Sequence, residues 1–263
     1  MTGKMNLSIK DVAKENLKDL DLICIPFLDK VEDKSDFIEG IEKRNEWYLK
    51  MMEHYGPISK VAYVDDLPAG MIQFIPRVSE LVFEIQCIFI LEKFAKKGIG
   101  SFLLRETINE LSTPKLFFKN RPPKALISWA FNVSGLVPQE DLFKKFGFIE
   151  SKCGRPLYLP IEKDYEYSYS RGKKIQERSN EKKAITVLDT SCPFCIFTVN
   201  KYKKISKEVS PQVEVCVVDK FRVSNETKCM IDFCEFNKKK IVSAFAKEDE
   251  IKESIKEAML AKL

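Results

Sequence analysis

The sequence predicts an α/β (α+β) chain of two domains, in which a mixed sheet flanked by helices is followed by a smaller unit. Two observations lead to this prediction. Apolar runs typical of strands alternate with stretches of helical periodicity along the 263 residues. A polar segment that carries both charge signs, 162–183, interrupts this pattern. We expect it to link a domain of residues 1–161 to a domain of residues 184–263, with local packing of its tyrosines as the alternative.

The composition excludes several classes of protein. Hydrophobic residues make up 44% of the chain, which is enough for real cores and argues against wholesale disorder. No apolar run approaches the roughly 18 residues of a spanning helix, and the N-terminus lacks the apolar core of a signal peptide. The net charge of +5 is too small, over a chain of this length, to form a nucleic-acid-binding face. We therefore expect a cytoplasmic protein that binds neither nucleic acid nor membrane.

The N-terminal part mixes helices with strands. Residues 35–56 have helical periodicity and end at a glycine, Gly56. Residues 60–76 hold two apolar runs around Asp65 and Asp66, a hairpin pattern. The other elements expected here are a long strand at 81–91, a helix at 101–112, a strand at 124–131, and a short helix ended by Gly147 with a strand after it.

The C-terminal part has the order β-α-β-β-β-α. Its first strand, 184–190, runs into a Cys-Pro-Phe-Cys motif, and an amphipathic helix follows at 195–209. A second strand at 213–219, a hairpin that turns near Asn237 and a closing helix from 248 complete the predicted unit.

The loop 92–100, which joins the long strand to the next helix, has the features of an anion site. The first turn of a helix has free backbone N–H groups and a partial positive charge. Gly98 and Gly100 would let a phosphate approach the backbone closely. Two glycines before a helix also occur in an ordinary turn, which is the alternative interpretation of this loop.

Residues 1 to about 160 resemble the GNAT superfamily of acetyl-coenzyme-A-dependent N-acyltransferases. The resemblance rests on the "AKKGIGSFLL" loop and helix, on the "LFKKFGF" segment and on the order of elements. It implies acetyl-CoA as cosubstrate, a pyrophosphate held by the loop, and a pantetheine arm received by the strand before it. The residues implied are Lys96, Lys97, Gly98, Ile99, Gly100 and Ser101 for the pyrophosphate, and Phe89 and Ile90 for the arm.

Two positions depart from the family pattern. Ala95 stands where the loop usually has Arg or Gln, which implies weakened but retained CoA binding. Phe143 stands where many members have a tyrosine that protonates the departing CoA thiolate, and a phenyl ring cannot do so. Because a thiol is a fair leaving group, this change slows catalysis without forbidding it.

Glu84 is the best candidate for a general base. It lies on the long strand inside an apolar run, where burial can raise a carboxyl pKa. The alternative is that Glu84 faces solvent on the other side of the strand, and Glu80 is the second candidate. His54, the one histidine of the chain, fits a helix C-cap better than a base.

Cys192 and Cys195 have three possible roles. With a strand before them and a helix after them, Cys192 is expected at the helix N-terminus and Cys195 one turn into the helix, as in a redox dithiol. The motif resembles the Cys-Pro-aromatic-Cys of glutaredoxins, and the 80-residue region resembles a thioredoxin-like domain. The alternatives are structural cysteines, or a metal site completed by Cys229 and Cys234.

The thioredoxin-like pattern also has a departure. Such domains place a cis-proline before the hairpin, whereas the corresponding place here is near Met230 and the nearest proline is Pro211. Cys229 would then lie close to Cys192 as a resolving thiol or a third ligand. Three other cysteines lie in apolar runs and are expected to pack as small hydrophobic residues: Cys24, Cys87 and Cys216.

Nearly the full chain resembles the YoaP-like acetyltransferases of Firmicutes, through the "LICI" stretch, the "WYL" helix, the "IQCIFI" strand and the CPFC domain. The first hypothesis is therefore an acetyl-CoA-dependent N-acetyltransferase acting on a small-molecule or protein amine. The alternatives are a CoA-binding redox sensor with little turnover and a disulfide oxidoreductase. The acceptor amine and the oligomeric state are not readable from these residues.

Overall fold

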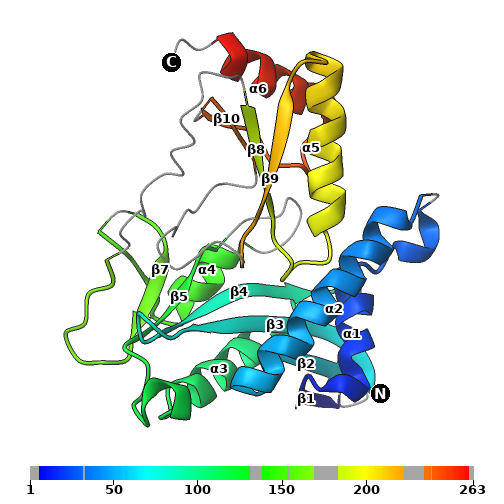
Figure 1. Ribbon diagram of the computed structural model, residues 1–263. Helices are drawn as coiled ribbons and strands as arrows, with labels where there is room; N and C mark the ends of the chain where they lie inside the picture. The colour runs from blue at the N-terminus through cyan, green and yellow to red at the C-terminus, as the bar shows by residue number, and fades with distance from the viewer. Residues whose placement is uncertain are drawn as a thin grey trace. The chain divides into compact units, whose positions relative to one another are not determined.

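The computed structural model divides the chain into two compact units. The first consists of residues 1–26 and 48–169, and the second of residues 27–47 and 170–263. Figure 1 traces the chain through both units. The residues described are 6–31, 33–130, 138–152, 154–168, 183–221, 234–237 and 239–260.

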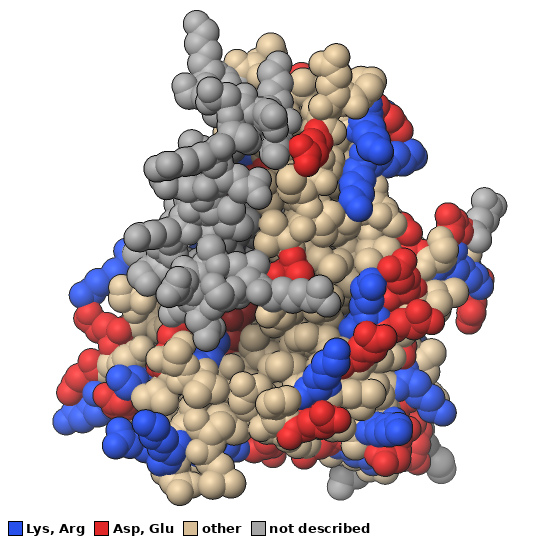
Figure 2. All heavy atoms as spheres, in the orientation of Figure 1, with Lys and Arg blue, Asp and Glu red and all other residues tan. Residues whose placement is uncertain are grey.

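The predicted α/β class is confirmed, with a large mixed sheet in the first unit and a smaller sheet in the second. Among the described residues, no helix has the length and apolar character needed to cross a membrane. On the face shown in Figure 2, cationic and anionic side chains are interspersed rather than gathered by sign. This distribution agrees with the small net charge of the sequence, +5.

Seven strands form the sheet of the first unit, in the order β1-β2-β3-β4-β5-β7-β6. All neighbours are antiparallel except β4 and β5, which are parallel. The strands are β1 (Leu7–Asp11), β2 (Ser59–Val64), β3 (Leu67–Arg77), β4 (Val82–Ile90), β5 (Ala125–Ser128), β6 (Ile149–Glu150) and β7 (Leu157–Pro160). The helices of this unit are α1 (Leu17–Cys24), the end of α2 (Ser35–Tyr55), α3 (Ile99–Leu111) and α4 (Gln139–Lys145).

The hairpin of β2 and β3 turns where the sequence predicts it. Asp65 and Asp66 both have positive φ, at 49° and 64°. Two successive residues of this kind match the twist of the flanking strands, which is why short polar residues occupy the turn. Gly56, with φ of 76°, ends α2 as predicted, and Gly147, with φ of 86°, follows α4.

The apolar core of the first unit lies on one face of the sheet, against α3. Helix α3 contributes Ile99, Leu103, Leu104 and Leu111, all at most 1% exposed. Their spacing is that of a single helix face, which explains why the pattern of the sequence predicts this helix. The facing strand residues include Ile72, Phe74, Phe83 and Ile85.

Part of the predicted linker belongs to the first unit. Tyr167 is 2% exposed and packs with Val82, Ile127 and Tyr158 on the face of the sheet opposite α3. Its hydroxyl donates to the Glu80 carboxylate at 2.8 Å. The rest of the predicted linker, 169–182, lies outside the described residues.

The second unit has a sheet in the order β11-β10-β8-β9, with β8 and β9 parallel and β10 antiparallel to β8. Its core packs α5 and α6 against this sheet, through residues such as Tyr202, Phe236 and Ile255. Asn237, with φ of 48°, turns the predicted hairpin. The elements are β8 (Lys183–Leu188), α5 (Cys195–Val209), β9 (Glu214–Asp219), β10 (Cys234–Phe236), β11 (Lys239–Lys240) and α6 (Glu248–Leu260).

Residues 27–47 pack with the second unit, whereas the predicted boundary at 161 places them in the first domain. The Phe37 ring stacks on Phe197 with centroids 5.0 Å apart and meets Phe194 edge-on at 5.8 Å. Asn200 donates to the Asp36 carboxylate at 2.8 Å. The apolar pattern of α2 shows that the helix is buried, but it does not show which sheet or helix covers it.

Gly40 should be intolerant of any side chain. A Cβ there would lie 2.0 Å from the carbonyl oxygen of Pro193, a backbone atom. In a helix interior Gly→Ala usually stabilises by about 1 kcal/mol, but here we expect a lower thermal midpoint for Gly40→Ala. Circular dichroism melts, with the exposed Glu42→Ala as control, test this. A stabilised Gly40→Ala protein would contradict the packing of α2 on Pro193.

Candidate functional site

The loop between β4 and α3 begins the candidate site. After β4 ends at Ile90, a short 3-10 turn (Glu92–Phe94) leads to Lys96, with φ of 59°, and Gly98, with φ of 80°. Gly98 is the N-cap of α3, and no side chain caps the helix there. The first-turn amides of α3 therefore have no side-chain acceptor from the cap residue, as an anion site requires.

Only one of the two glycines leaves open space above the loop. A Cβ at Gly98 would meet no atom within 4 Å, so its absence keeps a cradle that a side chain would fill. A Cβ at Gly100 would make ordinary contacts of 3.6 Å with Leu142 and 3.7 Å with Ile90. Gly100 is thus directed at α4 and β4, and Gly98 is the glycine that fits the approach of a phosphate.

The other predicted loop residues differ in what they present. Lys96 and Lys97 are exposed, and the Lys97 ammonium lies 5.5 Å from the centre of the Phe94 ring. Ile99 is 1% exposed, so its side chain belongs to the core and only its backbone is available to an anion. Ser101 is half-buried in the first turn of α3.

Strands β4 and β5 separate halfway along β4. Their pairing runs from Val82↔Ala125 to Ile85↔Ser128, while β4 continues to Ile90 with β3 as its partner. Both residues predicted for the pantetheine arm, Phe89 and Ile90, lie on this continuing stretch and are half-buried. On the same stretch, Gln139 at the start of α4 donates its amide to the Ile88 carbonyl at 3.0 Å. The end of the β4–β5 pairing at Ile85 therefore agrees with the predicted separation of β4 from its neighbouring strand.

Glu84 lies in a largely buried charged cluster. Its side chain is 13% exposed, and Arg77 Nη1 is 3.5 Å from Glu84 Oε2. The other Arg77 nitrogen, Nη2, is 2.8 Å from Glu80 Oε1. Glu80 thus has a short ion pair and the Tyr167 hydrogen bond, whereas Glu84 has, among the described residues, one longer contact, with Arg77. Burial raises the pKa of Tyr167, so its phenol stays protonated and donates.

Phe143 and His54, the two other residues considered for proton transfer, lie in different surroundings. Phe143 is 1% exposed in the core and meets Phe148 edge-on at 4.9 Å. His54 is exposed, with Nδ1 2.8 Å from the Lys50 carbonyl oxygen, which confirms its predicted place at the helix end.

The two cysteines of the CPFC motif have different surroundings. Cys195 is the first residue of α5, not one turn into it, because the helix begins only after Phe194. Cys195 is 3% exposed, and burial raises its pKa to about 11. Cys192 is half-buried and lies three residues before the helix. The more accessible thiol is therefore Cys192.

A largely buried acid, Asp189, lies beside the motif. Asp189 accepts from the Ser191 backbone at 3.1 Å and is paired with Lys220 at 2.7 Å. Burial would raise the pKa of Asp189, but the Lys220 ammonium and the Ser191 hydrogen bonds outweigh burial and hold this pKa below its usual range. The charge on Asp189 helps to keep the Cys195 pKa high.

The metal alternative gains no support from the part of the chain that the structure describes, where no three His, Cys, Asp or Glu residues form a cluster. Cys234 is 1% exposed in β10, and burial raises its pKa to about 12. Cys229 and Met230 lie outside the described residues. The remaining candidates for structural cysteines are half-buried: Cys24, Cys87 and Cys216.

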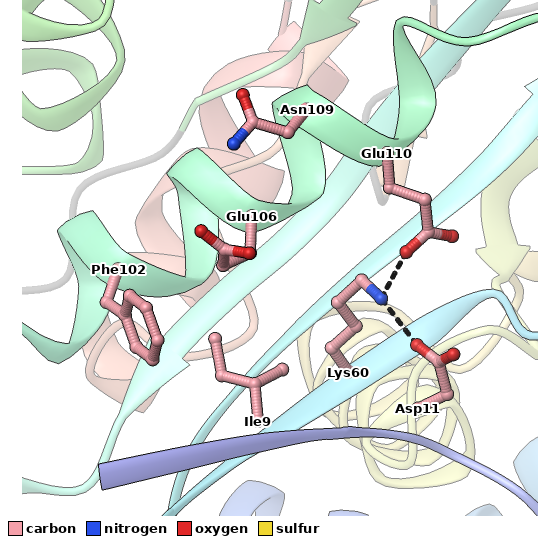
Figure 3. Close-up of a pocket in the computed structure, with 7 residues that line it drawn as sticks. All are labelled: Ile9, Asp11, Lys60, Phe102, Glu106, Asn109 and Glu110. Carbon is pink, nitrogen blue, oxygen red and sulfur yellow. Dashed lines mark hydrogen bonds and ion pairs between the residues drawn. The ribbon is translucent and has the colours of Figure 1, made fainter.

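A hollow of about 540 Å³ lies elsewhere in the first unit and contains none of the predicted site residues. Figure 3 shows Lys60 between Asp11 and Glu110, and Lys60 forms an ion pair with each of them. Lys60 Nζ lies 2.5 Å from Asp11 Oδ1. Lys60 is 6% exposed, so this cluster joins β1, β2 and α3 rather than offering a reactive amine. The remaining lining residues are Ile9, Phe102, Glu106 and Asn109.

Comparison with known proteins assigns a class to this arrangement. Residues 24–121 match the model of the "Acetyltransferase (GNAT) family", and the match includes β4, the loop and α3. The N-terminal part of the chain is therefore similar to the acetyltransferases of this family over residues 24–121. No curated protein sequence matches the chain significantly.

Three solved structures illustrate what the chain is similar to. A putative acetyltransferase from Pyrococcus horikoshii has 16% identity and a TM-score of 0.40, over 55% of this chain and 44% of that one. An N-acetyltransferase from Staphylococcus aureus has 18% identity and a TM-score of 0.42, over 60% and 99%. The PaiA N-acetyltransferase from Thermoplasma acidophilum, in complex with coenzyme A, has 15% identity and a TM-score of 0.41, over 59% and 97%. Likenesses this loose carry no argument about function.

Proposed function

We propose that this protein transfers the acetyl group of acetyl-CoA to an amine. The observation that carries the proposal is the combination of a glycine-led helix N-terminus with a strand, β4, that loses its β5 partner after Ile85. An opening between parallel strands beside a helix N-terminus suits a ligand with an extended arm and an anionic group. The matching family model supports the same chemistry.

The residues present fit acetyl-CoA, which when bound supplies an acyl carbon activated as a thioester. The first-turn amides of α3 would hold the pyrophosphate above Gly98, where no atom lies within 4 Å of a Cβ position. Lys96 and Lys97, both exposed, would add positive charge. Phe89 and Ile90 on the open stretch of β4 would line the arm.

Glu84 would accept the proton that the amine loses as its nitrogen bonds to the acyl carbon. It is favoured over Glu80 because Glu80 is held by both Arg77 and Tyr167 at 2.8 Å, whereas Glu84 has one contact of 3.5 Å. A carboxylate whose lone pairs are less occupied is the better proton acceptor. The Glu84 side chain is also largely removed from bulk water.

No phenol stands at the position of Phe143 to protonate the leaving thiolate, so solvent would do so after the carbon–sulfur bond breaks. A thiolate with a pKa near 8.5 leaves without obligatory help at neutral pH. The missing phenol therefore supports slow turnover. The alternative that a measurement of turnover must test is a CoA-binding module with little turnover.

Replacement of Gly98 tests the anion site. We expect Gly98→Glu to weaken acetyl-CoA binding by about 30-fold or more, roughly 2 kcal/mol, because the side chain fills the cradle with a negative charge. Isothermal titration calorimetry measures this. Gly56→Glu is the matched control, since Gly56 has nearly the same φ, 76°, and equally open surroundings. Equal affinity in the Gly98→Glu and wild-type proteins would contradict the proposed site.

The role of Glu84 is tested by Glu84→Gln, which keeps the shape and an oxygen for Arg77 but removes the base. We expect kcat to fall by about a hundredfold or more, with acetyl-CoA affinity unchanged. Product formation in an amine panel, followed by mass spectrometry, gives kcat. Glu80→Gln should change kcat far less. A larger loss in Glu80→Gln would reverse the assignment of the base.

We further propose that the C-terminal unit is a thioredoxin-like dithiol domain, as in the YoaP-like proteins. Support comes from its β-α-β-β-β-α order, with parallel β8 and β9 and a hairpin beside β8, and from the contrast between Cys192 and Cys195. A more accessible attacking thiol and a buried partner suit disulfide exchange.

Alkylation tests this contrast. In reduced native protein at pH 8, iodoacetamide should modify Cys192 much faster than Cys195, because a thiol of pKa about 11 is roughly 0.1% thiolate at that pH and is buried. Peptide mapping measures both rates, and urea-denatured protein, where the rates should converge, is the control. Equal rates in the native state would remove the support for distinct roles.

A further inference from the structure

The residue at which β4 departs from regular pairing is Gln86. Gln73 of β3 pairs with Cys87 and Phe74 pairs with Ile85, so Gln86 is one extra residue, a β-bulge. Bulges re-aim side chains and are common beside active sites. This bulge directly follows Ile85, the last residue of β4 that pairs with β5.

A buried amide pair lies at the bulge, on the face of the sheet that carries Glu84. Ile75 is opposite Glu84, and Gln73 is two residues from Ile75, so Gln73 shares that face. Gln73 is 3% exposed and donates its amide nitrogen to Gln86 Oε1 at 3.0 Å. The amide of Gln86 therefore lies on the same face as the proposed base.

The amide nitrogen of Gln86 is buried and has no hydrogen-bond partner among the residues that the structure describes. A buried N–H without an acceptor is destabilising, and a β-branched residue would suit this strand position better. The Gln86 amide is such a donor, on the same face as the Glu84 carboxylate and at the place where β4 and β5 separate. A donor in this position can bind an oxygen atom of a ligand.

We propose that Gln86 binds an oxygen of the acceptor, and that the acceptor is an amine with a neighbouring neutral carbonyl, an amino-acid amide or a peptide N-terminus. This assignment rests on the proposed acetyl transfer. The open edge of β4 lies in the plane of the sheet, whereas the Gln86 amide is on its face with Glu84, which takes the acceptor's proton. Glu80 and Glu84 against Arg77 leave a net negative charge, which disfavours a free carboxylate on the acceptor.

The test compares two amines of similar size, alaninamide and sec-butylamine, which lacks the carbonyl. Wild-type protein should acetylate alaninamide with the higher kcat/KM. Gln86→Met should raise the KM for alaninamide about tenfold and leave that for sec-butylamine unchanged, because one hydrogen bond to a neutral group is lost. Gln212→Met, the same change at an exposed glutamine of the other unit, should alter neither KM.

Acetyl-CoA titration of each protein separates the two levels of failure. Loss of acetyl-CoA binding in the wild-type protein would refute the proposed function itself. Intact binding without preference for alaninamide, or without turnover of either amine, overturns the acceptor assignment alone. An equal rise in both KM values in Gln86→Met would show a structural role for Gln86 and would also overturn it.

Discussion

The separation of β4 from β5 is the constraint on which the candidate site of the first unit depends. Parallel pairing holds the two strands together from Val82 to Ile85, and the bulge at Gln86 then changes the course of β4. The polar features of the proposed acetyl-transfer site follow one another along this part of the chain: the carboxylate of Glu84 before the bulge, the amide pair at it, and the loop to α3 after the end of β4. A straight, fully paired β4 would leave no edge for an extended ligand.

One face of the sheet holds the apolar core, and the other holds the charged residues of the candidate site. On one face, α3 buries apolar residues against Ile72, Phe74 and Phe83, and its hydrophobic pattern accounts for its position. The other face tolerates Arg77, Glu80 and Glu84 because each buried charge has a partner, and Tyr167 closes the cluster. Buried charges of this kind contribute little net stability, which favours a functional reason for their presence.

Much of the fold was predictable from the sequence, because periodicity reports burial. Helices α3 and α5 and the Asp65–Asp66 turn follow from spacing and turn chemistry alone. The grouping of residues 27–47 with the second unit was not predictable, since an apolar helix face does not name what covers it. The packing of Tyr167 was hidden for a similar reason, because the polar residues around it give no periodic signal.

The site was predictable where its chemistry depends on the backbone and hidden where it depends on which side chains are buried. Gly98 could be proposed from its place before a helix, but only the structure separates it from Gly100, whose Cβ direction leads to Leu142. Gln86 carries no sequence signal, because a glutamine in a strand usually alternates to solvent. Alternation along β4 sets Gln86, two residues after Glu84, on the same face as Glu84, and only the structure shows that its amide is buried there against Gln73.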